Sequence, residues 1–146
     1  MSADGHTRSH RIIIHSLDHA RAALDAAAAV GVPVTLASAI GAGGYAGPLW
    51  FKAVIEAALH DHPGVTAAAV LDCGDEAGTT LGALRAGLKL VRFTGRDDVR
   101  ERLAAIAAQL GAAIESGEPV PALDLLDAGD PARLCRAYLA GNKTGD

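Results

Sequence analysis

The sequence predicts an α/β protein with five mostly parallel strands and flanking helices. Short apolar runs of strand length alternate with alanine-rich helical patterns along the chain, which is typical of βα units. Some of these runs are apolar at successive positions, as in Ile12-Ile13-Ile14, and this indicates strands buried on both faces of a parallel sheet. At 146 residues the chain is long enough for one domain with one hydrophobic core.

The expected elements have recognisable ends. Strands are expected at residues 11–15, 33–38, 66–71, 88–93 and 112–115, and helices at residues 18–30, 48–60, 76–86, 96–110 and 131–140. Gly31, Gly87 and Gly111 each follow a helical pattern and are expected to end it. A glycine-rich turn at residues 41–47 leads to Pro48, which is suited to the first position of the next helix.

The last part of the chain is expected to dock on the rest. Glu118 to Pro121 indicates a linker. Asp130 and Pro131 then mark the start of a last helix that we expect Gly141 to end. Its expected apolar contacts are Leu134, Tyr138 and Leu139. We therefore expect one domain over residues 1–146, made of a flexible N-terminus (1–9), a βα core (10–117) and a linker with a docking helix (118–146).

Composition and charge argue against several classes of protein. The net charge is −4 and the basic residues are scattered, which gives no support for binding nucleic acid or an anionic membrane. No apolar run approaches the ~18 residues that span a bilayer. Cys73 and Cys135 lie far apart and the N-terminus lacks the apolar core of a signal peptide, so we expect a reduced, cytoplasmic protein without a disulfide.

The candidate site lies where the second and third strands end. The second strand runs into the turn at residues 41–47, and the third ends at Asp72 and Cys73. The carboxyl ends of parallel strands are where α/β proteins place their sites. Asp72 is therefore a candidate general acid or base, and Cys73 a candidate thiolate or metal ligand. The simpler interpretations are a turn-forming aspartate and a buried structural cysteine.

Further polar groups are candidates for ligand binding at the same strand ends. Backbone N–H groups of the glycine-rich turn can approach an anion, although an ordinary turn explains the glycines equally well. His15, near the start of a helix, and Arg96, directly after Gly95, also have a simpler explanation as solvated side chains. The complete set of candidate ligand-binding residues is His15, Ser38, Gly41, Gly43, Gly44, Cys73, Thr94 and Arg96.

Several short motifs keep their order and spacing over about a hundred residues. They are HARAALDAA (19–27), Pro33-Val34, GAGGYAG (41–47), VLDCG (70–74), Ala86-Gly87, Thr94-Gly95 and Ile114-Glu115. With these motifs, residues 18–117 resemble the first half of the class II, metal-dependent fructose-bisphosphate and tagatose-bisphosphate aldolases. The resemblance implies half of a (β/α)8 barrel, whereas the alternation of strands and helices equally allows a flavodoxin-like open sheet.

The resemblance also implies that the family's metal centre has degenerated. In the family an aspartate that transfers protons is followed directly by a metal-binding histidine, and these positions are Asp72 and Cys73 here. The first histidine of the family's H-x-D-H motif is replaced by Val70, and a loop serine is replaced by Ala39, with Ser38 one residue earlier. The other metal ligands belong to the second half of the family's barrel. We therefore expect no metal and no other cofactor.

Together these patterns predict an aldolase-related protein without aldolase activity. We expect it to bind a small anionic metabolite or a protein partner at the C-terminal ends of its strands. The alternative is a lyase-like enzyme of altered chemistry that uses Asp72 and Cys73, at a site completed by a second chain. Five strands leave two open edges, so we also expect a homodimer or higher oligomer whose contact is made by open sheet surface or by the last helix. Lys89 and Arg92 are expected to protect the fourth strand.

Overall fold

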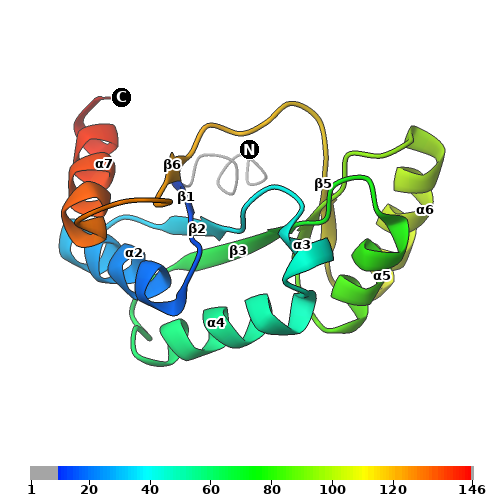
Figure 1. Cartoon of the computed structure of the whole chain (residues 1–146), viewed down its shortest axis with the longest axis horizontal. Helices are drawn as coiled ribbons and strands as arrows, with labels where there is room; N and C mark the ends of the chain where they lie inside the picture. The colour runs from blue at the N-terminus through cyan, green and yellow to red at the C-terminus, as the bar shows by residue number, and fades with distance from the viewer. Residues whose placement is uncertain (1–9, 146) are drawn as a thin grey trace. The chain divides into compact units, whose positions relative to one another are not determined.

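The computed structural model describes residues 10–145, and the side chains of residues 10–141. They form a six-stranded parallel sheet flanked by helices (Figure 1). The strands are β1 (His10–Ile13), β2 (Val34–Ala37), β3 (Ala67–Asp72), β4 (Leu90–Arg92), β5 (Ala113–Glu115) and β6 (Leu123–Asp124). The helices are α2 (Leu17–Val30), α3 (Ala42–Tyr45), α4 (Pro48–His60), α5 (Ala77–Arg85), α6 (Asp97–Gln109) and α7 (Pro131–Gly145). The predicted α/β class is confirmed.

The strand order can be compared with the two architectures that the sequence allowed. The order is β5-β4-β3-β2-β1-β6, so the first five strands are neighbours in chain order. β6 pairs in parallel with the free side of β1, with Ile12 opposite Leu123 and Ile13 opposite Asp124. An eight-stranded barrel also places its last strand beside its first, whereas a flavodoxin-like sheet has the order 2-1-3-4-5. The observed order is not that of flavodoxin, and the parallel sheet is consistent with a partial barrel or with an open sheet of another order.

Three elements differ from the sequence prediction. β6 was not expected, because a strand of two residues is too short to show a periodic pattern. The glycine-rich turn contains the single helical turn of α3. Gly141 does not end α7, which continues to Gly145. A glycine inside a helix costs only about 1 kcal/mol relative to alanine, so Gly141 by itself cannot stop the helix.

The described residues form two compact units, and each is presented by itself. Unit 1 consists of residues 10–36, 54–68 and 120–145. In this unit α2 packs along α7 (Figure 1). The buried side of α2 is made mostly of alanine, and such small side chains let two helices approach closely. α7 buries Cys135 and Leu139, which lie one turn apart, whereas the expected contact Leu134 is exposed.

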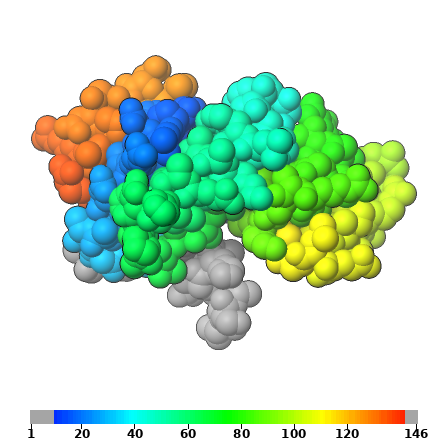
Figure 2. Space-filling view, turned by 90° about the horizontal axis from the view of Figure 1, so that it is seen from below, coloured from blue at the N-terminus to red at the C-terminus, as the bar shows by residue number. Residues whose placement is uncertain are grey.

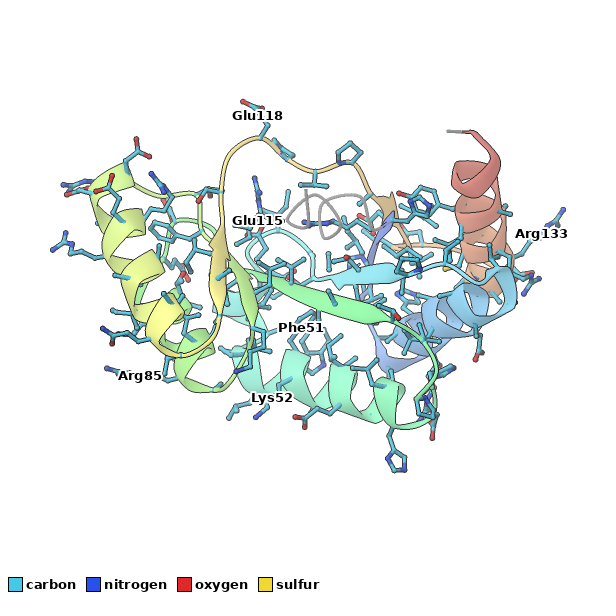
Figure 3. The ribbon with its side chains drawn as sticks, turned by 180° about the vertical axis from the view of Figure 1, so that it is seen from behind. Phe51, Lys52, Arg85, Glu115, Glu118 and Arg133 are labelled. Carbon is cyan, nitrogen blue, oxygen red and sulfur yellow. The ribbon has the colours of Figure 1, made fainter. Side chains whose placement is uncertain are left out.

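Unit 2 consists of residues 37–53 and 69–119. Here β4 pairs in parallel with β3 on one side and with β5 on the other. Helices α5 and α6 lie side by side (Figures 1 and 2). Phe51 points from α4 toward the sheet and is fully buried, whereas Lys52 points away from the sheet (Figure 3). Within the described part of the chain, no helix is both long and apolar enough to cross a bilayer.

Lys89 and Arg92 do not protect an exposed strand edge, so this expectation was wrong. Lys89 lies outside β4, and its amino group donates a hydrogen bond to the carbonyl of Leu110 at 3.3 Å. Arg92 is buried, and β4 has no open edge because it pairs with β3 on one side and with β5 on the other. The outer strand at this end of the sheet is β5.

In unit 1, His62 links the segment after α4 to α2. Its Nδ1 lies 2.8 Å from the carbonyl oxygen of Ala58, and its Nε2 lies 2.5 Å from Asp25 Oδ1. Both neighbours are hydrogen-bond acceptors when Asp25 is ionised, so both ring nitrogens must donate, which requires the imidazolium form. The hydrogen bond to Asp25, followed by the one to Ala58, raises the pKa of His62 above its ordinary value of 6.5.

The His62–Asp25 pair should therefore stabilise the fold only at low pH. Because the pKa of His62 is raised in the folded state, its contribution is complete below pH 6.5 and is lost as the pH rises through the folded pKa. We expect Asp25→Asn to lower the free energy of unfolding by about 0.5–1 kcal/mol at pH 5.5 and to have little effect at pH 9, since Asp25 is largely exposed. Urea unfolding at the two pH values measures this.

Asp75→Asn is the control for this prediction, because it removes an exposed carboxylate from a turn in unit 2. It should change stability by a similar small amount at both pH values. If Asp25→Asn lowered the free energy of unfolding equally at pH 5.5 and pH 9, the stabilisation by the His62–Asp25 pair would not depend on the charged imidazole.

Candidate functional site

Three charged residues occupy the last positions of neighbouring strands in unit 2. Asp72 ends β3, Arg92 ends β4 and Glu115 ends β5. The strand register places Asp72 beside Arg92 and Arg92 beside Glu115. Residues in register on adjacent strands point to the same face of a sheet, so the three side chains meet. Glu115 is labelled in Figure 3, where it lies near the end of β5.

The three side chains form a buried ionic cluster centred on Arg92. Their side chains are only 10–17% exposed. Arg92 Nε lies 3.7 Å from Asp72 Oδ2, and Arg92 Nη1 donates to Glu115 Oε1 at 3.2 Å. The second terminal nitrogen of Arg92 donates to the carbonyl of Gly117. Buried charges are tolerated when they are paired and hydrogen-bonded in this way.

The remaining carboxylate oxygen of Asp72 is bound by the backbone. Asp72 Oδ1 accepts hydrogen bonds from the N–H groups of Gly41, at 3.0 Å, and Gly74, at 2.8 Å. The bond to Gly74, two residues further along the chain, is characteristic of an aspartate-stabilised turn. The carboxylate thus connects the glycine-rich segment after β2 to the turn after β3.

Ser38 contributes to the same arrangement from the end of β2. Its hydroxyl accepts a hydrogen bond from the N–H of Asp72 at 2.9 Å and donates one to the carbonyl of Ala39 at 2.9 Å. The residue is buried. The structure therefore places Ser38 beside the backbone of Asp72, with its hydroxyl engaged both as donor and as acceptor.

Cys73 is also enclosed by the glycine-rich segment. The residue is 1% exposed, and a Cβ atom on Gly43 would lie 2.6 Å from its Sγ. Burial raises the pKa of the Cys73 thiol to about 11. The thiolate is the form that attacks electrophiles and binds metals, so this side chain remains an uncharged thiol at neutral pH.

The residues present do not fit the metal centre that the aldolase resemblance implies. The position of the metal-binding histidine holds the buried thiol of Cys73. Among the described residues, no group of three or more His, Cys, Asp or Glu side chains is placed to hold a metal ion. Catalytic metal sites in proteins need about three such ligands.

The glycines of the segment after β2 allow close packing on the turn after β3. Gly41 has a φ of 73°, in the left-handed region, and its N–H is bound by Asp72. A Cβ atom on Gly44 would lie 2.5 Å from a carboxylate oxygen of Glu76. The predicted residues Gly41, Gly43 and Gly44 are thus brought together with Asp72 and its turn.

Thr94 and Arg96 lie in the loop between β4 and α6. Thr94 is exposed, and its N–H donates to the carbonyl of Gly74 at 2.8 Å. The Arg96 side chain is 79% exposed and forms two hydrogen bonds with Asp98, at 3.1 and 2.7 Å. Arg96 is therefore already paired with a carboxylate.

His15 belongs to unit 1, where it forms a second polar cluster. Its Nε2 lies 2.6 Å from Asp124 Oδ1, and its backbone N–H donates to Nδ1 of His19 at 3.0 Å. Burial and the neighbouring His15 lower the pKa of His19. Burial favours the protonated form of Asp124, but hydrogen bonds from His15 and from the N–H of Leu126 lower its pKa overall. This pairing brings together the ends of β1 and β6.

Sequence reasoning missed Arg92 and Glu115 as partners of Asp72, and Asp124 as the partner of His15. A signal for the first cluster was present, since three successive strands end near an acidic, a basic and an acidic residue. Asp124 lies in the strand that the sequence did not reveal, so no comparable signal pointed to it.

Comparison with known proteins supports the fold and nothing finer. No family model and no curated protein matches this sequence. A solved structure named as a candidate fructose-1,6-biphosphate aldolase from Coccidioides immitis is similar, with a TM-score of 0.64 and 18% identity, over 86% of this chain and 49% of that chain. Another, named as a candidate tagatose 6 phosphate kinase from Sinorhizobium meliloti 1021, has a TM-score of 0.56 and 16% identity, over 92% of this chain and 45% of that chain. This chain spans about half the length of these solved structures, and it has an aldolase-like fold.

Proposed function

We propose that this chain is an aldolase-related binding protein that engages a protein partner at the C-terminal ends of its strands and does not cleave sugar bisphosphates. The observation that carries this proposal is the state of Asp72. Its carboxylate accepts hydrogen bonds from Gly41 and Gly74 and lies against Arg92. A group that transfers protons must be able to reach the proton of a substrate, and this carboxylate is committed to the fold.

The same geometry disfavours the alternative enzyme that would use Asp72 and Cys73. Such an enzyme needs a free carboxylate or a thiolate at the end of β3. The pKa of the Cys73 thiol is raised to about 11, mainly by burial, so little thiolate forms near neutral pH. Both cysteines are free thiols, which suits a reducing compartment, and we propose a cytoplasmic location on this ground.

A protein partner is favoured over a small anionic metabolite by the charges at these strand ends. Arg92 is paired with Asp72 and Glu115, and Arg96 is paired with Asp98. An incoming phosphate would have to displace a carboxylate from either guanidinium. In the segment after β2, the apolar side chains of Ile40, Tyr45 and Leu49 are exposed, and such side chains suit contact with a protein better than contact with an anion.

The test is an assay of aldol cleavage with fructose 1,6-bisphosphate and tagatose 1,6-bisphosphate, each with Zn²⁺, Co²⁺ or Mn²⁺. We expect no turnover above the buffer rate, and we expect calorimetric titration with either sugar bisphosphate to give no heat of binding at millimolar concentration. Metal-dependent turnover that Asp72→Asn abolishes would overturn the proposal. Saturable binding of a sugar bisphosphate would instead identify the partner as a small anion.

A further inference from the structure

Three elements of unit 1 meet at His15, which follows β1. Its side-chain Nε2 lies 2.6 Å from Asp124 Oδ1 in β6, and its backbone N–H donates to Nδ1 of His19 in α2 at 3.0 Å. In Figure 1, β6 lies beside β1, and the chain passes from β1 directly into α2. Ser16, the N-cap of α2, accepts a hydrogen bond from the N–H of His19 at 3.1 Å. The connection between β1 and α2 is therefore held by the His19 ring and by the Asp124 carboxylate.

The hydrogen bond from His15 to His19 requires an uncharged His19 ring. A backbone N–H group can only donate, so Nδ1 of His19 must be an unprotonated acceptor, and the proton of the neutral ring lies on Nε2. When the ring gains a second proton, both of its nitrogens become donors. The N–H of His15 then faces another donor in a partly buried position, where water replaces the lost acceptor incompletely.

The groups around His19 oppose its protonation but do not prevent it. The rings of His15 and His19 meet edge to face, with their centroids 5.7 Å apart. Burial and, after it, the positive charge of a protonated His15 lower the pKa of His19 from 6.5, whereas Asp18 and Asp124 act in the opposite direction more weakly. The stabilisation that the neutral His19 ring contributes is therefore complete above pH 6.5 and is lost as the pH falls through the folded pKa.

Asp124 keeps its charge while His19 takes up its proton. Burial alone would raise the pKa of Asp124, but the hydrogen bonds from His15 and Leu126 lower it from 3.8. The carboxylate is then still ionised at pH 4.5 and can hold the side chain of His15. Acid consequently acts on the α2 side of His15 before it acts on the β6 side.

We propose that the junction of β1, α2 and β6 is a proton-operated switch, in which a proton on Nδ1 of His19 releases the backbone N–H of His15 and loosens the connection between β1 and α2. The added proton comes from the solvent and binds the lone pair of Nδ1, and no covalent bond breaks. β6 stays paired with β1, because the contact between His15 and Asp124 remains. This inference goes beyond the proposed function, since it concerns a change within unit 1 that needs no partner.

Nuclear magnetic resonance of the whole chain between pH 8 and pH 4 tests the switch. We expect the imidazole ¹⁵N shifts to show His19 neutral at pH 8, with its proton on Nε2. As this ring takes up its second proton, the protection factor of the His15 N–H against hydrogen exchange should fall at least about tenfold. The N–H of Val34, which donates to the carbonyl of Thr66 in the same unit, should keep its protection factor within about twofold, because the unit stays folded.

Two variants of the histidines separate the switch from a merely structural contact. In His19→Asn, the amide Oδ1 offers an acceptor near the position of Nδ1 but cannot be protonated, so the protection factor of the His15 N–H should become independent of pH within about twofold. His15→Gln keeps a donor for Asp124 but removes the neighbouring positive charge, so it should move the His19 titration to higher pH. His60→Asn is the matched control, since His60 is exposed in the same unit, and it should change neither result.

Three results would overturn the inference. A proton on Nδ1 of His19 at pH 8 would contradict the hydrogen bond on which the switch depends. A protection factor of the His15 N–H that stays constant through the His19 titration would show that protonation releases nothing. The same loss of protection in His19→Asn as in the original chain would assign the change to another group. The dispersion of the amide resonances shows in each case that the variant is folded.

Discussion

Replacing Arg92 by methionine is expected to lower the free energy of unfolding by about 3–5 kcal/mol. Methionine keeps most of the volume of the arginine stem but removes the guanidinium between Asp72 and Glu115. The two buried carboxylates are then left without their shared cation, and the carbonyl of Gly117 loses its donor. Urea unfolding at pH 7, followed by circular dichroism, measures the change.

Arg96→Met is the matched control for this prediction. Arg96 also pairs with a carboxylate, but its side chain is 79% exposed, so its loss should cost less than about 0.5 kcal/mol. Adding Glu115→Gln to Arg92→Met should restore about 1 kcal/mol or more, because it removes one of the two buried negative charges that have lost Arg92. A loss below about 1 kcal/mol for Arg92→Met would mean that the cluster contributes no more than a surface ion pair.

The sequence was sufficient to predict the fold class, because the α/β class follows from patterns that are local in the chain. Apolar runs of strand length and capped helical patterns are visible without knowledge of neighbouring elements. β6 escaped prediction because its two residues, Leu123 and Asp124, gain their strand conformation only by pairing with β1. The order of the strands in the sheet depends on such pairing throughout, and so it also needed the structure.

The sequence predicted the strand ends at which the candidate residues lie, but not the contacts between their side chains. Asp72 was expected to end its strand, and it does. Arg92 was expected to protect a strand edge. Alternation along a strand shows which face of the sheet a side chain occupies, but it does not show which residues of the adjacent strands lie beside it. The fourth strand was expected at residues 88–93 and is observed at Leu90–Arg92, but its pairing with the third and fifth strands could not be predicted. Partnership across strands depends on register, which the sequence did not specify.

Replacing Gly43 by alanine is the second substitution with a large expected effect, a loss of about 2–3 kcal/mol in the free energy of unfolding. The added Cβ would lie 2.6 Å from Cys73 Sγ and 3.2 Å from the carbonyl oxygen of Asp72. Gly43 lies in α3, where alanine is conformationally acceptable, so the loss arises from overpacking and not from backbone strain. The crowded atoms cannot move freely, because Cys73 is buried and Asp72 is held by its hydrogen bonds.

Gly82→Ala separates this steric effect from the general effect of exchanging a helical glycine for alanine. Gly82 lies within α5, and a Cβ atom there would meet nothing within 4 Å, so the change should raise stability by about 0.5–1 kcal/mol. The double variant Gly43→Ala/Cys73→Ala should be less destabilised than the sum of its single variants by about 1 kcal/mol, since removing Sγ makes room for the new methyl group. If Gly43→Ala instead raised stability as Gly82→Ala is expected to do, the segment after β2 would not be packed tightly on Cys73.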